Sequence, residues 1–240
     1  MSAIIRPASP HWVRLFSHNT QRWRQFAASF NEHTVRLNPA FIPSIQAFQL
    51  TEQSEGKRLL AIANQYAARH HAPEYVAAIQ QFIQEEQRHA DYLSRVLRAN
   101  GAGTLNKQWV DSIFRQLRQR LGPSTLLSLL LVAEIVAIAY YSSLARASED
   151  LQAKCLFERI LQDETTHIQF HCNHIAPCLS FTHRIGQHLV LGATIIVVWV
   201  EHSHVLKHRF RSLFQMMDYC HRLLTKSIDI HCSQKGTDTL

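Results

Sequence analysis

The 240-residue chain is predicted to be all-α, a bundle of long helices. Glycine and proline number 7 each, 14 of 240 residues together, which is about half their usual share. So few turn-forming residues disfavour a sandwich or barrel of many short strands. Hydrophobic residues make up 46% of the chain, enough for a full core, and they recur at helical spacing through long segments.

The first half of the chain gives three helices from its apolar spacing and its end signals. A helix around residues 19–36 is expected before the prolines at Pro39 and Pro43. Helical spacing then continues from Ser44 to about His70. The next helix runs from Pro73, well placed in a first turn, to Ala99, where Asn100 and Gly101 supply the stop.

The second half gives the remaining helices. A short amphipathic helix is expected over 107–121, and Gly122, Pro123 and Ser124 begin a long helix that reaches about Ser148. A further helix covers roughly 148–177, and two more cover about 183–207 and 209–227. The predicted organisation is therefore an N-terminal helical segment (1–43), a four-helix bundle (44–177), and C-terminal helices with a polar tail (178–240).

Polar residues interrupt the apolar faces of these helices at corresponding places. Glu86 and His89 form a Glu-x-x-His pair, and Glu164 and His167 form a second, with His171 one turn further along. The i, i+3 spacing places a carboxylate and an imidazole one turn apart on the same side of a helix. The others are Glu134, within an otherwise apolar run, and the neighbouring pair Glu52 and Glu55.

Carboxylates on apolar faces need a compensating charge, because burying an isolated carboxylate costs several kcal/mol. Two divalent cations would balance four carboxylates. The step from Glu55 to Glu86 is 31 residues and that from Glu134 to Glu164 is 30. Such a step, up one helix and back down its antiparallel neighbour, returns the chain to the same height. All four positions are therefore expected to meet at one level of the bundle.

In these motifs the sequence resembles the ferritin-like di-iron carboxylate proteins, which include ribonucleotide reductase small subunits, rubrerythrins and di-iron oxygenases. Their order of ligands is a carboxylate, Glu-x-x-His, Glu and Glu-x-x-His on four successive helices. The resemblance covers roughly residues 45–175. It implies a ferritin-like four-helix bundle whose metal ligands are Glu55, Glu86, His89, Glu134, Glu164 and His167.

The resemblance also assigns roles to neighbouring residues. Reductase-type members place an aspartate before the second Glu-x-x-His, which implies that Asp163 orients His89, although a solvated Asp163 is the simpler interpretation. Tyr141 lies two helical turns after Glu134. Some members of the family hold a radical on a tyrosine near the metals, but an ordinary core tyrosine is the commoner role. His171 is either a third nitrogen ligand or a buried histidine bonded to a carbonyl.

The helix predicted from Ser44 to His70 offers two candidates for its metal ligand. Glu55 is favoured as the metal ligand, partly because Gly56 leaves room beside it, and Glu52 is the other candidate. If Glu55 binds the metal, acid–base catalysis falls on Glu52 or on a hydroxide held by the metals.

The resemblance implies a di-iron oxidase or oxygenase that uses dioxygen and an electron donor on an unidentified small substrate. Ligation dominated by oxygen, with one histidine per ion, suits two iron ions, with manganese possible, better than structural zinc. The alternatives are a non-catalytic iron-binding storage protein with ferroxidase activity, a di-manganese catalase-like enzyme, a tRNA hydroxylase, and a metal-free polar network. A homodimer is possible.

Charge and composition bear on location and partners. The chain has 25 Lys+Arg against 18 Asp+Glu, a net charge of +7. The basic residues are dispersed, so dedicated nucleic-acid binding is not expected. No signal-peptide core is found at the N-terminus, and the longest apolar run, residues 189–200, is too short to span a bilayer. A cytoplasmic protein without a membrane span is predicted.

Overall fold

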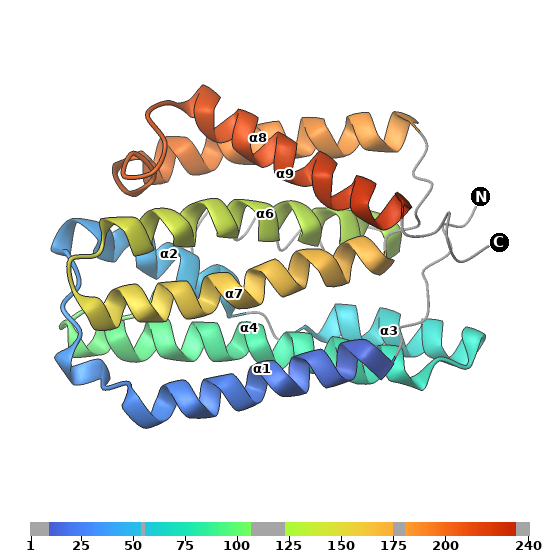
Figure 1. Ribbon diagram of the computed structural model, residues 1–240, viewed down its shortest axis with the longest axis horizontal. Coiled ribbons are helices and arrows are strands. Elements are labelled where there is room, and N and C mark those ends of the chain that lie inside the picture. The colour runs from blue at the N-terminus through green and yellow to red at the C-terminus, as the bar shows by residue number, and fades with distance from the viewer. Residues whose placement is uncertain (1–9, 54–55, 107–122, 175–180, 234–240) are drawn as a thin grey trace. The chain divides into compact units, whose positions relative to one another are not determined.

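The computed structural model describes residues 10–53, 56–106, 123–174 and 181–233 of the chain (Figure 1). These residues form α-helices and short 3-10 helices, and no strand occurs among them, which confirms the all-α prediction. The chain divides into two compact units. The N-terminal unit holds α1 to α4 and the start of α7 as far as Leu156. The C-terminal unit holds α6, α7 from Phe157 onwards, α8 and α9.

The N-terminal unit is built around α4 (Pro73–Ala99). The helices α1 (Pro10–Ser29), α2 (Ile42–Glu52) and α3 (Lys57–His70) each pack against α4. The bounds predicted for α4 are confirmed, because Pro73 opens the helix and Gly101, with a φ of 73°, follows its end. The prediction for the first helix was wrong, since α1 ends at Ser29, well before residue 36.

Two 3-10 turns connect α1 to α2. They cover Glu32–Thr34 and Pro39–Phe41, and an asparagine side chain caps each one. The Glu32 carboxylate accepts hydrogen bonds from the Arg95 guanidinium of α4 at 2.8 and 3.0 Å. These contacts fix the connection on α4, so that α2 enters the unit against the same helix as α1.

The single helix predicted from Ser44 to His70 is two helices in the structure. The helix α2 ends at Glu52 and α3 begins at Lys57. Gly56 lies between them with a φ of 60°, in the left-handed region that favours glycine. A Cβ at Gly56 would meet the side chain of Ile83 on α4, so the break in the helix is also a close approach between backbone and core.

The C-terminal unit contains α6 (Pro123–Ala147), the part of α7 (Leu151–His174) from Phe157 onwards, α8 (Phe181–Leu206) and α9 (Leu213–Ser233). The helix α6 packs against α8 and α9, which also pack against each other (Figure 1). These four helices follow the predicted ranges to within a few residues at most ends. The helix predicted over 107–121 lies outside the described residues, and the predicted 44–177 bundle draws on both units and stays a prediction.

Among the described residues, two helices are long and apolar enough to cross a membrane. They are Thr125–Ala147 and Phe181–Leu206, whose most apolar 18-residue windows are 78% and 39% buried. Sequence reasoning missed both as candidate spans because it considered only the longest uninterrupted apolar run, and single small or polar residues interrupt these two helices. Length and composition of this kind suit the core helix of a soluble protein as well as a membrane helix, so the predicted location and the absence of a span stay predictions.

Candidate metal centre

The N-terminal unit brings Glu52, Glu86 and His89 together. One ligand atom of each lies within 4.8 Å of the other two. The Nδ1 atom of His89 lies 3.9 Å from Glu52 Oε2 and 3.8 Å from Glu86 Oε1. His89 is fully buried, and its ring packs 5.8 Å from the Trp23 ring of α1. We call these three residues the N-terminal cluster.

The helix boundary explains why Glu52 reaches the N-terminal cluster. Glu52 is the last residue of α2, where the chain turns away towards Gly56, and it is buried against α4. Sequence reasoning gave this residue an acid–base role and favoured Glu55 as the ligand. Glu55 lies outside the described residues, so its assignment stays a prediction, while Glu52 is close enough to Glu86 and His89 to bind the same ion.

The C-terminal unit brings Glu134 of α6 together with Glu164, His167 and His171 of α7, which we call the C-terminal cluster. The Nδ1 atom of His167 lies 3.2 Å from Glu164 Oε2 and 3.7 Å from Glu134 Oε2. His171 Nε2 lies 3.3 Å from the other oxygen of Glu134, Oε1. The two oxygens of one carboxylate thus face two different imidazoles, and all four residues are buried.

The charge state of Glu134 is set by its neighbours. Burial alone would raise the pKa of this carboxyl group, but hydrogen bonds from His167 and His171 lower the pKa well below its ordinary value. Glu134 is therefore ionised at neutral pH. An ionised carboxylate held between imidazoles has lone pairs available for a cation without first losing a proton.

His174 lies one turn beyond His171 and has a different environment. Its Nδ1 is 2.7 Å from the carbonyl oxygen of Phe170, and burial lowers its pKa to about 4 although that hydrogen bond opposes the shift. It is therefore a neutral core histidine at physiological pH. Of the three α7 histidines, His167 and His171 therefore contact carboxylates, and His174 does not take part in the cluster.

Asp163 and Tyr141, the predicted neighbours of the site, are both fully buried. The Asp163 carboxylate forms an ion pair with Arg159, one turn earlier on α7. Sequence reasoning missed Arg159, although its i, i+4 spacing to Asp163 was visible. The predicted contact of Asp163 with His89 would join the two units and stays a prediction. The ring of Tyr141 packs on Tyr140, with 5.4 Å between ring centroids.

The spacing of the donor atoms in both clusters is compatible with a shared metal ion. Two ligands that each lie about 2.1 Å from one ion are separated by roughly 3 Å or more. The N···O distances of 3.2 to 3.9 Å in the two clusters fall in that range. The donors are carboxylate oxygens and imidazole nitrogens, which suit iron or manganese.

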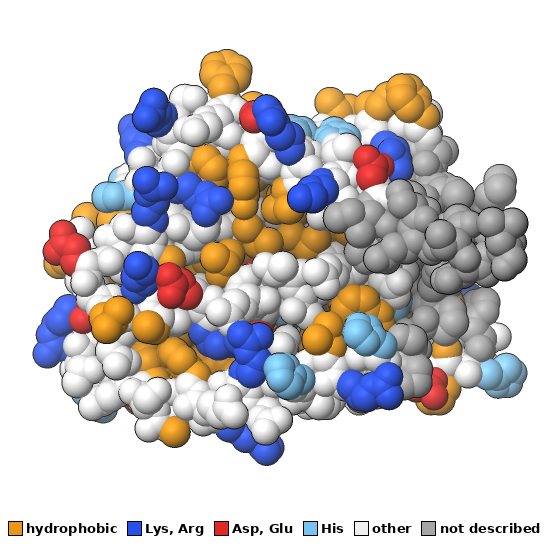
Figure 2. All heavy atoms as spheres, in the orientation of Figure 1, with side chains coloured by type: hydrophobic (Ala, Val, Ile, Leu, Met, Phe, Trp, Pro, Cys, Tyr) orange, Lys and Arg blue, Asp and Glu red, His pale blue; other side chains and the backbone are white. Residues whose placement is uncertain are grey.

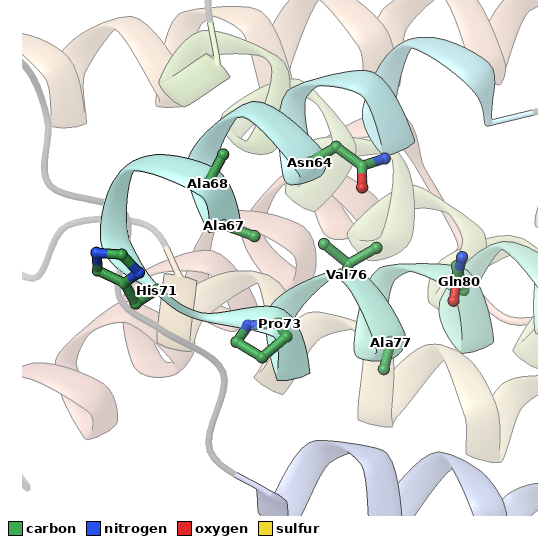
Figure 3. Close-up of a pocket in the computed structure, with 8 residues that line it drawn as sticks. All are labelled: Asn64, Ala67, Ala68, His71, Pro73, Val76, Ala77 and Gln80. Atoms are coloured by element: carbon green, nitrogen blue, oxygen red, sulfur yellow. The ribbon is translucent and has the colours of Figure 1, made fainter.

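A separate cavity of about 590 Å³ opens at the α3–α4 turn (Figure 3). It is lined by Asn64, Ala67, Ala68, His71, Pro73, Val76, Ala77 and Gln80. None of these residues is a carboxylate or a member of either cluster. The side chains of Ala67, Ala68 and Ala77 are small, which leaves this space open. The lining residues do not form a group of metal ligands.

No protein-family model, curated protein or solved structure matches the chain.

Proposed function

We propose that the protein is a ferritin-like di-iron protein in which the N-terminal and C-terminal clusters supply ligands for two iron ions, and that it is a dioxygen-dependent oxidase or oxygenase acting on a small substrate. One observation carries the proposal. Each unit, by itself, gathers two carboxylates and at least one imidazole from the motifs that the sequence singled out. Chance pairing of a Glu-x-x-His motif with a partner carboxylate from another helix would not be expected twice.

The chemistry follows from the donor set. Bound iron would supply the redox reactions of dioxygen, which amino-acid side chains cannot perform. The chain's part is to hold ligands in place and to exclude water. Trp23 covers His89 on one side, and Phe170, fully buried, lies beside His171. An electron donor is required if the iron is to be reduced again after each turnover.

Glu86 is the most exposed member of either cluster, with 17% of its side chain accessible. The N-terminal cluster is therefore the one that a small molecule could reach from solvent. Glu52, buried next to His89, is placed to take up or release a proton there, provided that Glu55 or another residue completes the ligand set.

Metal content per chain, by inductively coupled plasma mass spectrometry, tests the proposal on protein produced with equal iron and manganese. We expect two iron atoms per chain in the natural protein and in the control Glu149→Gln, whose side chain is exposed. Glu134→Gln should hold fewer than one, because it removes the carboxylate that faces both His167 and His171. Two metals retained in Glu134→Gln would refute the site.

Further outcomes separate the alternatives. Two manganese atoms per chain would favour a catalase-like enzyme. Dioxygen uptake that stops after the bound iron is oxidised, even with excess reductant, would favour storage, whereas continued uptake supports an oxidase or oxygenase.

A further inference from the structure

The helix α8 has two contrasting faces. One face is buried against α6 and α9. The other carries large apolar side chains that are exposed to solvent: Phe181 (77%), Ile185 (44%), Leu189 (69%), Ile196 (45%) and Val200 (74%). At about 100° per residue these five positions fall within one arc of roughly 100°. We call them the α8 stripe.

The α8 stripe is comparable to the largest apolar patch that a soluble monomer usually exposes. Its side chains present on the order of 500 Å² to water, and patches of roughly 300–600 Å² on monomers often have a function. Figure 2 shows hydrophobic side chains projecting at the edge where Figure 1 draws α8 and α9. The stripe lies before His202, where the backbone of α8 departs from helical values, so all five residues are on a regular helix.

Charge argues against a helix that lies flat on a lipid surface. Helices that lie on membranes carry many Lys and Arg residues along a polar face. Among its Lys, Arg, Asp and Glu positions, α8 has only Arg184 and Glu201. Arg184 bonds to Asp229 at 3.3 Å, and Glu201 lies 3.5 Å from His202, so both are engaged within the chain. An uncharged stripe can face another apolar surface without burying a charge.

The spacing of the stripe suits a second copy of the same chain. Ile185, Leu189, Ile196 and Val200 are separated by four, seven and four residues, a pattern that reads the same in both directions. Two antiparallel helices related by a two-fold axis at the midpoint would place Ile185 of one copy against Val200 of the other, and Leu189 against Ile196. Ala193, small and exposed, lies next to that midpoint and allows close approach.

We propose that the α8 stripe is the interface of a homodimer, in which the α8 helices of two copies pack antiparallel about residues 192–193. An apolar area of on the order of 500 Å² per copy buries about 1,000 Å² in total, which reaches the lower bound for a specific interface. The dimer does not depend on the metal centre, because the stripe contains none of its residues.

Sedimentation equilibrium of the full chain tests the interface over a micromolar concentration series. The natural chain should have twice the monomer mass of 27.7 kDa. Leu189→Glu should weaken association by about 100-fold or more, because it buries an unpaired charge at the interface. The control Leu151→Glu, which alters an equally exposed leucine outside the stripe, should remain dimeric. Circular dichroism shows whether each variant keeps its helices.

A charge pair tests the antiparallel register. Ile196→Lys alone should dissociate the dimer, and the double variant Leu189→Glu/Ile196→Lys should restore it, because each introduced carboxylate faces an introduced ammonium on the other copy. The two positions are seven residues apart on one helix, too far to pair within a copy. A monomeric natural chain, a dimeric Leu189→Glu variant, or a monomer that floats with phosphatidylglycerol vesicles through the stripe would each overturn the proposal.

Discussion

The buried ion pair of α7 allows the stability and the metal-binding role of one side chain to be measured separately. Asp163 is fully buried and Arg159 nearly so, and they contact each other one turn apart. Arg159→Met removes the cation and leaves the Asp163 carboxylate in the core without its ion-pair partner. Breaking a buried pair in this way costs about 3–5 kcal/mol.

For a chain of this size, a loss of 1 kcal/mol lowers the melting temperature by about 2–4 °C, so the expected fall is on the order of 10 °C. Lys154→Met is the matched control, because Lys154 lies on the same helix with its side chain exposed. The control should shift the melting temperature by no more than about 2 °C. Differential scanning calorimetry of both variants, without metal, measures the difference.

The double variant Arg159→Met/Asp163→Leu removes both charges. Replacing a buried pair by apolar residues is often neutral or stabilising, so most of the lost stability should return. If Asp163 also orients a metal-binding histidine, metal affinity should still fall about 10–100-fold, the usual effect of losing such a hydrogen bond. Titration with manganese under nitrogen measures that affinity.

Two results would refute this reasoning. An Arg159→Met variant as stable as Lys154→Met would mean that the ion pair contributes nothing. A double variant as unstable as the single one would trace the loss to the packing of the arginine stem rather than to the broken ion pair. Full stability with full metal affinity in the double variant would leave Asp163 with a purely structural role.

Two further predictions concern a histidine and a glycine. Burial lowers the pKa of His202 from 6.5 to about 4, although Glu201 is close. As pH falls below 6.5, the unfolded chain therefore binds a proton at this histidine before the folded chain does. The folded state loses stability as a result. Between about pH 7 and pH 5, His202 should lower the free energy of unfolding by roughly 2 kcal/mol. Urea unfolding of His202→Gln should therefore show a flatter dependence of this free energy on pH. An unchanged slope would contradict the prediction. Gly56→Ala should cost about 1–3 kcal/mol more than Gly101→Ala, because both glycines have positive φ but only Gly56 faces a side chain, that of Ile83. Equal losses in urea unfolding would show that Ile83 moves aside freely.

Local signals in the sequence predicted most helices and failed where packing decides. The bounds of α4 were predicted because Pro73 and Gly101 act on their own backbone. The break between α2 and α3 was missed, since apolar spacing continues across it, and the close approach of Gly56 to Ile83 of α4 is a tertiary contact that local spacing does not reveal. Hydropathy likewise could not show which face of α8 is covered, because that depends on the positions of α6 and α9.

The site followed the same rule. Pairs one turn apart on a single helix, such as Glu86 with His89 and Glu164 with His167, were predictable from spacing alone. The contribution of Glu52 was harder to assign, because it depends on where α2 ends.

The two clusters differ in how a cation from solvent would reach them. Glu134 faces two imidazoles, and their effect keeps its pKa low. Every member of the C-terminal cluster is buried. In the N-terminal cluster, the imidazole of His89 lies 3.8 and 3.9 Å from two carboxylates, and one of these, Glu86, keeps 17% of its side chain accessible. Because an ion must enter through an accessible ligand, the N-terminal cluster should take up a cation more readily than the C-terminal cluster.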